Sequence, residues 1–285
     1  MRIVSTVAEL REARKDFPSL GFVPTMGFLH EGHISLVKAA KARMGAVACS
    51  IFVNPTQFAP TEDLARYPRD LERDLSLLVD AGCDLVFTPD ASEVYPPGFS
   101  TRIEVDGVTA PLEGAVRPGH FSGVATVVTK LFNMVQPDAA WFGQKDAQQC
   151  AVIRRMARDL DLPVEIVVAP TIREPDGLAM SSRNVYLTPD DRAAAVVLIR
   201  ALTAAEAAFD AGERDADGLR ALMTSVLEGE PRGTPDYVSI ADPDTLEELK
   251  AVDERGAVAS LAVRFGKTRL IDNLLLGDAR QKWLR

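Results

Sequence analysis

The sequence predicts an α/β fold in which a doubly wound parallel sheet is followed by a smaller α+β domain. In residues 1–172, short apolar runs of strand length alternate with segments of helical periodicity, as in parallel sheets covered by helices on both faces. From residue 173 onwards, two helical segments come first and three strand-like segments follow. We therefore expect a Rossmann-like domain over 1–172, and over 173–285 a smaller α+β domain that closes over the active site.

The first domain is predicted to alternate between strands and helices. The run AVACSIFVN has the apolar composition of a fully buried strand. In the helical segment after it, Leu71, Leu75, Leu78 and Val79 recur at helical spacing, and Gly82 marks the helix end. The predicted strands are 21–25, 46–54, 83–89, 139–143 and 163–171, and the predicted helices are 33–43, 68–82, 122–135 and 146–160.

The second domain begins with a long alanine-rich helix predicted over 189–212, because Pro189 and the aspartates after it are typical of a helix start. Another helix is predicted over 215–229, and a strand over 236–243. The two apolar runs that follow, 257–266 and 268–277, flank a Gly-Lys turn. That pattern predicts a β-hairpin.

The composition excludes several classes of function. The net charge of −9 argues against nucleic acid or an anionic membrane as the main partner, because both favour basic proteins. The three cysteines lie far apart in apolar surroundings, which predicts buried free thiols and argues against zinc bound by cysteine. No signal peptide is indicated, and no apolar stretch approaches the roughly 20 residues of a membrane span. We expect a cytoplasmic protein.

Polar segments follow several of the predicted strands. The connections 55–69 and 89–120 are long and rich in proline, glycine and charge, as functional loops often are. In open α/β sheets the ligand lies outside the carboxyl ends of the strands. The segments PTMGFLHEGH, NPTQF and FGQKDAQQ should therefore converge in one crevice.

Two of the three histidines, His30 and His33, stand three residues apart where a strand gives way to a helix. A zinc protease motif would need a spacing of four, so a zinc site is disfavoured. A pair of structural histidines remains an alternative. The third interpretation is a phosphate site, because a helix N-terminus offers free N–H groups and a positive dipole end. Gly27 and Gly32 would let the backbone approach the anion.

Other segments carry cations and hydroxyl groups suited to a nucleotide. Lys145 and Asp146 follow a strand, although a surface lysine beside a helix cap explains them equally well. Ser181, Ser182 and Arg183 could wrap a triphosphate or belong to a plain linker. The sequence contains neither G-x-G-x-x-G after the first strand nor a P-loop motif, so a dinucleotide dehydrogenase and a P-loop enzyme both lose their main support.

Neutral polar groups complete the set. Asn54 and Gln57 follow a strand, and their amides suit recognition of a hydroxyl or carboxyl group. Arg117 and the third histidine, His120, stand just before a helix. Together these segments contain cations and groups that can donate hydrogen bonds to an anion, although the chain as a whole is acidic. A pocket for ATP would have this composition.

Five segments in order resemble the signatures of the pantothenate synthetase (pantoate–β-alanine ligase) family: PTMGFLHEGHISLV, FVNPTQF, RPGHFSGVATVVTKLF, FGQKDAQQ and GLAMSSRNVYL. They extend over about residues 20–188. The resemblance implies a nucleotidyltransferase-type fold and a cytoplasmic homodimer that depends on ATP and magnesium. It implies condensation of pantoate with β-alanine through a pantoyl adenylate to give pantothenate, a precursor of coenzyme A, with a first domain that binds ATP and pantoate.

The resemblance also implies roles for individual residues. Those implied as catalytic are His33, His30, Lys145 and Arg183, with His33 as the proton donor. Those implied to bind ATP are Met26, Gly27, Phe28, Leu29, His30, Glu31, Gly32, His33, Gly143, Gln144, Lys145, Asp146, Ile172, Met180, Ser181, Ser182 and Arg183. Those implied to bind pantoate or β-alanine are Gln57, Gln149, Asn54, Arg117 and His120.

Three positions depart from the family pattern. Gln144 stands where glutamate is common, Ala147 where an aromatic residue is common, and Arg73 where an acidic residue is frequent. Asp74 then has no acidic neighbour at position 73, so no protein ligand of magnesium is assigned and Asp74 is kept only as a candidate. Three rival functions stay open: another nucleotidyl-transferring or adenylate-forming enzyme of this fold, a metal-dependent hydrolase using the three histidines, and a nucleotide-sensing module.

Overall fold

A computed structural model describes residues 1–58 and 64–284. Residues 59–63, which belong to the predicted connection 55–69, lie outside the described residues. The chain divides into two compact units. The first consists of Met1–Gly143 and Val152–Ala169, and the second of Gln144–Ala151 and Pro170–Arg285. The predicted domain boundary after residue 172 stays a prediction.

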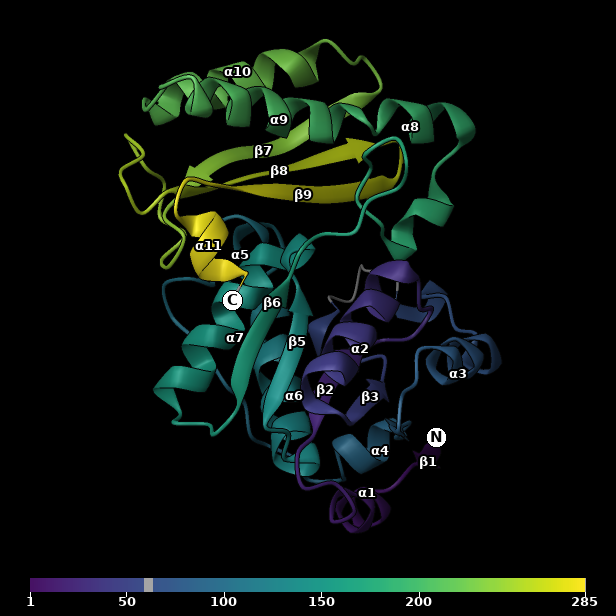
Figure 1. The fold of residues 1–285 in the computed structure, drawn as a ribbon. Coiled ribbons are helices and arrows are strands. Elements are labelled where there is room, and N and C mark those ends of the chain that lie inside the picture. The colour runs from purple at the N-terminus through teal and green to yellow at the C-terminus, as the bar shows by residue number, and fades with distance from the viewer. Residues whose placement is uncertain (59–63, 285) are drawn as a thin grey trace. The chain divides into compact units, whose positions relative to one another are not determined.

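The first unit is built on a six-stranded parallel sheet with the order β1-β4-β3-β2-β5-β6 (Figure 1). The predicted doubly wound parallel sheet is therefore confirmed. Its strands are β1 (Arg2–Val4), β2 (Gly21–Thr25), β3 (Val47–Ile51), β4 (Leu85–Phe87), β5 (Ala139–Gly143) and β6 (Glu165–Ala169). Its helices are α1 (Val7–Arg14), α2 (Glu31–Met44), α3 (Leu71–Asp80), α4 (Ala91–Val94), α5 (Glu113–Val116), α6 (His120–Val135) and the part of α7 (Ala147–Asp159) from Val152 onwards.

Helices pack on both faces of this sheet. On one face, Val37 and Ala40 of α2 pack against the strand residues Val23, Cys49 and Trp141. On the other face, Phe132 of α6 meets Phe142 of β5 edge to face, with ring centroids 6.4 Å apart. Successive strand side chains point to opposite faces, so continuous apolar runs bury both of them.

The sequence prediction omitted four elements of this unit: β1, α1 and the short helices α4 and α5, which lie within the predicted connection 89–120. β1 is only three residues long and pairs with the sheet on one side, where its register with β4 joins Ile3 to Val86. Helix α1 begins with a capping box, in which Thr6 accepts from the N–H of Glu9 and the Glu9 carboxylate accepts from the N–H of Thr6. The segment T-V-A-E carries that signature in the sequence.

The second unit contains a three-stranded antiparallel sheet with the order β7-β8-β9 (Figure 1). Helices α9 and α10 cover one face of it and share its core. The predicted hairpin is formed by β8 and β9. The elements are α8 (Pro189–Ala194), α9 (Val197–Asp210), α10 (Ala216–Glu228), β7 (Gly233–Ala241), β8 (Ala257–Phe265), β9 (Thr268–Leu276) and α11 (Ala279–Trp283).

The prediction of one continuous helix over 189–212 is wrong, because the chain breaks between α8 and α9 at Ala195 and Val196. The N–H of Leu198 bonds to the carbonyl of Ala195, three residues back, which tightens the turn there. Ala195 is fully buried and Leu198 nearly so. Core packing therefore sets the break that alanine-rich helix propensity does not show.

Asp236 joins all three strands of the second sheet. It lies at the β-bulge of β7, and its carboxylate accepts from Arg264 Nε of β8 at 3.0 Å and from Arg269 Nε of β9 at 2.6 Å. Burial alone would raise its pKa, but the two guanidinium groups outweigh burial and hold the pKa below its usual range.

We expect Asp236→Asn to be less stable than the parent chain by about 1 kcal/mol near neutral pH. The native pKa is depressed, so this stabilisation is present above the unfolded pKa and is lost as the pH falls through the native pKa. The difference in unfolding free energy should therefore shrink below about pH 4. Urea unfolding of both proteins across that range measures it, and a difference independent of pH would contradict the assignment.

Two further observations concern the described residues as a whole. Cys49, Cys83 and Cys150 are buried thiols that form no disulfide, as predicted, and burial raises the pKa of the Cys83 thiol to about 11. Among the helices of residues 1–58 and 64–284, none has the length and hydropathy of a membrane span.

Candidate functional site

The strand order of the first unit predicts where a ligand binds on its sheet. β2 pairs with both β3 and β5, and the chain runs from β2 through β3 to β4 on one side before it crosses to β5 on the other. In open α/β sheets, ligands bind at the carboxyl ends of the strands where the order reverses in this way. The chain leaves β2 at Thr25 and reaches α2 through Met26–His30.

The turn after β2 has an unusual backbone. Gly27 and Phe28 are both left-handed, with φ of +81° and +50°. A Cβ on Gly27 would come within 3.0 Å of both Asp74 Oδ2 and Ile51 Cγ2. Glycine is required here because the positive φ and these close neighbours exclude a side chain. The close neighbour on this side is the Asp74 carboxylate of the chain itself. The sequence interpretation, that Gly27 lets the backbone approach a phosphate, stays a prediction.

Asp74, in the first turn of α3, holds this turn in place. Its Oδ2 accepts from the N–H of Phe28 and its Oδ1 from the N–H of Leu29, both at 2.7 Å, and the residue is 1% exposed. Its neighbour Arg73 donates from Nη1 to the carbonyl of Leu29 at 2.8 Å. Burial raises the pKa of Asp74, and the two N–H donors and Arg73 act against that rise. Each carboxylate oxygen accepts one backbone N–H, so the structure shows Asp74 holding this turn. Its role as a magnesium ligand stays a prediction.

His30 and His33 lie at the start of α2, directly after this turn. Their ring centroids are 4.1 Å apart, and the backbone N–H of His30 donates to His33 Nδ1 at 3.3 Å. A ring nitrogen that accepts carries no proton, so a neutral His33 has its proton on Nε2. The helix N-terminus adds N–H groups and a positive dipole end at the same place. The local arrangement suits donation to an anion.

Asp74→Asn should disturb this arrangement without unfolding the chain, because an amide nitrogen would face one of the two N–H donors. The chain has only three histidines, so imidazole signals in a ¹H–¹⁵N spectrum can be assigned individually. We expect the His30 and His33 signals to shift clearly and the His120 signal to shift less. Asp70→Asn, which keeps a good N-cap on the same helix, is the control. Unchanged His30 and His33 signals would contradict the positioning role of Asp74.

Asn54 and Gln57 lie next to the same turn. The Nδ2 of Asn54 donates to Gln57 Oε1 and to the carbonyl of Gly123, each at 3.1 Å, while its Oδ1 accepts from Tyr95 Oη at 2.8 Å. Gln57 Nε2 in turn approaches Met26 Sδ at 3.0 Å. The segments PTMGFLHEGH and NPTQF therefore contact each other through Met26 and Gln57. The predicted convergence of both with FGQKDAQQ in one crevice stays a prediction. Asn54 is 1% exposed and orients Gln57.

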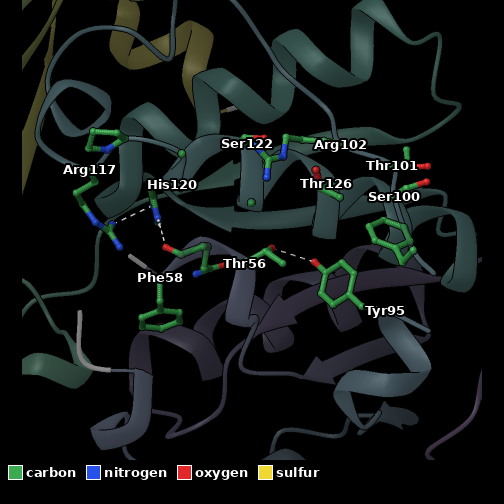
Figure 2. Close-up of a pocket in the computed structure, with 15 residues that line it drawn as sticks. Thr56, Phe58, Tyr95, Ser100, Thr101, Arg102, Arg117, His120, Ser122 and Thr126 are labelled. Carbon is green, nitrogen blue, oxygen red and sulfur yellow. Dashed lines mark hydrogen bonds between the residues drawn. The ribbon is translucent and has the colours of Figure 1, made fainter. Parts of the chain in front are cut away.

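A cavity of about 370 Å³ adjoins Gln57 in the first unit (Figure 2). Figure 2 shows Arg117 and His120 at one end and Tyr95, Ser100 and Thr101 at the other. Most of its lining residues have polar side chains, but apolar atoms form the larger part of the lining surface. The lining residues are Thr56, Gln57, Phe58, Tyr95, Phe99, Ser100, Thr101, Arg102, Arg117, Pro118, Gly119, His120, Ser122, Gly123 and Thr126.

The hydrogen bonds of His120 define its tautomer. Arg117 Nη1 lies 3.0 Å from His120 Nε2, and arginine can only donate, so Nε2 accepts. Nδ1 therefore carries the proton and donates to the carbonyl of Gln57 at 2.9 Å. At Gly123 of α6, a Cβ would lie 2.4 Å from the carbonyl oxygen of Thr56. Glycine at that position thus allows α6 to pack directly against the Pro55–Gln57 turn.

The second unit holds the lysine segment. Gln144–Asp146 forms a single 3₁₀ turn, and the Lys145 side chain, 20% exposed, approaches Asp146 at 3.5 Å. Asn273 of β9 contacts this turn three times. Asn273 Oδ1 accepts from Gln144 Nε2 at 3.1 Å. Asn273 Nδ2 donates to the carbonyls of Gln144 and Lys145 at 3.0 and 2.9 Å.

The segment around Ser181 is also ordered by local hydrogen bonds. The N–H of Met180 bonds to the carbonyl of Ile172 at 3.0 Å, which closes a small loop. Ser181 Oγ then accepts from the N–H of Arg183 at the start of a 3₁₀ turn over Ser182–Tyr186. The four residues Met180–Arg183 are partly exposed.

Sequence reasoning missed the residues that hold these segments. The role of Asp74 in binding the turn after β2 was not predicted, and neither were the contacts of Asp272 and Asn273. A signal existed for the second pair, because two adjacent polar residues interrupt the apolar run TRLIDNLLLG. Across residues 1–58 and 64–284, no group of three or more His, Cys, Asp or Glu side chains is arranged to hold a metal ion.

A family model for pantoate-beta-alanine ligase matches residues 2–275 of the chain. The chain belongs to the pantoate–beta-alanine ligase family. A pantothenate synthetase of Herpetosiphon aurantiacus is 64% identical over 276 residues, which cover 97% of this chain and 100% of that protein. As a member of this family, the chain is an acid–amine ligase.

Solved structures of family members share the fold. The pantothenate synthetase of Thermus thermophilus is 53% identical and superposes with a TM-score of 0.92, covering 96% of this chain and 99% of the other. The pantoate-beta-alanine ligase of Francisella tularensis, solved in complex with beta-gamma ATP and beta-alanine, is 35% identical with a TM-score of 0.79 and covers 96% and 97%. The predicted resemblance to the pantoate–beta-alanine ligase family is confirmed.

Proposed function

We propose that this chain condenses (R)-pantoate with β-alanine at the expense of ATP, giving pantothenate, AMP and pyrophosphate through a pantoyl adenylate. The observation that carries the proposal is the family match over residues 2–275, which includes every residue assigned a role below. The Francisella tularensis relative, solved with beta-gamma ATP and beta-alanine, supports the choice of nucleotide and amine.

The chemistry requires activation of a carboxylate before an amine can attack it. A carboxylate oxygen of pantoate attacks the α-phosphorus of ATP, and pyrophosphate leaves. The uncharged amine of β-alanine then attacks the acyl carbon, loses a proton and expels AMP, which keeps the bridging oxygen. Positioning of the reactants and stabilisation of phosphoryl charge account for most of the expected rate enhancement.

In the first unit, the turn after β2 and the start of α2 would bind the α-phosphate. His33 donates from Nε2, because its Nδ1 accepts from the backbone N–H of His30. His30 lies within ring contact of it and would share the developing negative charge. Asp74 and Arg73 fix the backbone that carries both histidines.

In the second unit, Lys145 and the segment 180–183 would bind nucleotide phosphates. Lys145 supplies a compact positive charge, and Arg183 a planar cation that can bind two phosphoryl oxygens. Ser181 Oγ accepts from the N–H of Arg183 and keeps its O–H proton, so both Ser181 and Ser182 offer a hydroxyl donor. Gly143, Gln144, Asp146 and Ile172 would contact the ribose and the adenine.

The acid and the amine would bind near Gln57. Its amide lies against Met26 and is oriented by Asn54, which places it beside the turn that carries the histidines. Arg117 and His120 line the adjoining cavity, where the Arg117 guanidinium would attract a carboxylate and His120 would orient that guanidinium through Nε2. Gln149 on α7 remains a candidate for pantoate on the family resemblance alone.

Magnesium is proposed only as the partner of ATP: Asp74 binds the backbone of the turn, and among the described residues no group of three or more His, Cys, Asp or Glu side chains is arranged to hold a metal ion. No catalytic step is assigned to it. We also expect a homodimer and a cytoplasmic location from the family resemblance. Light scattering of the purified chain tests the first expectation.

Pyrophosphate release from ATP tests the proposal. It should depend on D-pantoate, and AMP and pantothenate should appear when β-alanine is added. Release that ignores pantoate would contradict the proposal. A stable nucleotide-linked product that β-alanine does not consume would instead favour another nucleotidyl-transferring enzyme of this fold.

A further inference from the structure

Two adjacent residues of β9, Asp272 and Asn273, contact two separate segments of the second unit. Asn273 bonds to the turn that carries Lys145, as described above. Asp272 forms a two-pronged ion pair with Arg173, with Oδ2 to Nη1 at 2.6 Å and Oδ1 to Nη2 at 3.0 Å. Arg173 lies in the loop that leads to Met180–Arg183. One strand therefore contacts the Lys145 turn and the loop that leads to the second proposed phosphate-binding segment.

The strand geometry explains how neighbours reach two segments. Successive side chains of a strand point to opposite faces of the sheet. Asp272 is separated from Leu270 and Leu276 by an even number of residues, so it lies on the same face of β9 as these two leucines, which belong to the core that α9 and α10 cover. Asn273, the next residue along the strand, lies on the other face of the sheet. The two segments are therefore attached to the two faces of β9 at a single point.

These contacts are buried. Asp272 and Asn273 are each 2% exposed, and Gln144 is 6% exposed. Arg173 also donates to the carbonyl of Gly177 at 3.1 Å, so the ion pair fixes the loop backbone as well as the side chain. The N–H of Asn273 donates to Asp272 Oδ1 at 2.8 Å, which joins the two sets of bonds. Buried, fully bonded polar groups of this kind hold one geometry in preference to others.

We propose that Asp272 and Asn273 are positioning residues, which set the Lys145 turn and the 173–183 loop in the arrangement that binds the nucleotide. Neither touches substrate. The expected effect on ATP binding rests on the proposed function. The expected effect on the order of the two segments does not. Gln144 takes part because its amide N–H₂ can donate to Asn273 Oδ1, which a glutamate carboxylate cannot do.

Hydrogen exchange measured by mass spectrometry tests the structural consequence. Asn273→Ala should speed exchange mainly in residues 144–151, and Asp272→Asn mainly in residues 172–184, each by about tenfold or more. Asp236→Asn is the matched control, because it removes a carboxylate that pairs with two arginines in the same sheet but contacts neither segment. Equal acceleration of both segments in all three variants, or none in either test variant, would overturn the proposal.

Calorimetric titration with ATP tests the functional consequence. We expect Asn273→Ala and Asp272→Asn to bind ATP about 10- to 100-fold more weakly, while Asp236→Asn stays within about twofold of the parent. KM for ATP should rise more than kcat falls. Unchanged ATP affinity with accelerated exchange would overturn the positioning role. A parent chain that binds no ATP would instead refute the proposed function, and the exchange data would still decide the structural assignment.

Discussion

Replacing His33 by alanine is expected to lower pantoate-dependent pyrophosphate release by about 10²- to 10⁴-fold, the range of a lost donor in the transition state. The ring takes its orientation from the backbone N–H of His30, which directs the proton to Nε2. Because this donor acts on charge that develops during adenylation, kcat should fall much more than the affinity for ATP.

Two variants control the His33 experiment. Ser35→Ala removes a side-chain hydrogen bond to Gly32 on the same helix without touching the imidazoles, and should keep near-normal turnover. His33→Gln retains an N–H donor and should recover part of the loss. Turnover of His33→Ala within about threefold of the parent would remove His33 from the mechanism.

Lys145→Ala should lower kcat/KM for ATP by about 10²- to 10³-fold, because one fixed cation for the phosphates is lost. Here the larger share should appear as weaker ATP binding, since Lys145 meets charge that is already present in the ground state. Arg183→Ala should behave in the same way. Steady-state kinetics with ATP varied at saturating pantoate separate KM from kcat.

The control for Lys145→Ala is Lys267→Ala, which removes the same charge from the turn between β8 and β9. The two variants have the same net charge, so any long-range electrostatic effect of that charge on ATP binding is the same in both. A loss in Lys267→Ala as large as that in Lys145→Ala would mean that overall charge, and no specific contact, governs binding.

The strands and helices that carry the segments were predictable because each apolar run ends at a glycine, proline or polar cluster. β5 was predicted at its observed bounds, Ala139–Gly143, and the hairpin of β8 and β9 followed from its Gly-Lys turn. β1 was missed because three residues at a sheet edge show no periodicity. The break at Ala195 was missed because it depends on packing against a sheet that lies later in the chain.

The candidate site was only partly predictable: its motif residues could be found in the sequence, but the residues that hold those motifs in place could not. Residues proposed to face a ligand stand in recognisable motifs, such as His30 and His33 in one turn. Residues that hold those motifs come from elsewhere in the chain, since Asp74 follows the turn it binds by 45 residues or more and Asn273 follows Lys145 by 128. Such pairings arise only when the chain folds, so a single sequence does not reveal them.

Oxygen transfer tests the central claim most directly. With pantoate labelled with ¹⁸O in both carboxylate oxygens, adenylation of the acid predicts that each AMP formed carries one ¹⁸O atom and that pyrophosphate carries none. Mass spectrometry of the two products after a single turnover measures this. Unlabelled AMP, or label in pyrophosphate or inorganic phosphate, would contradict activation of the carboxylate at the α-phosphorus.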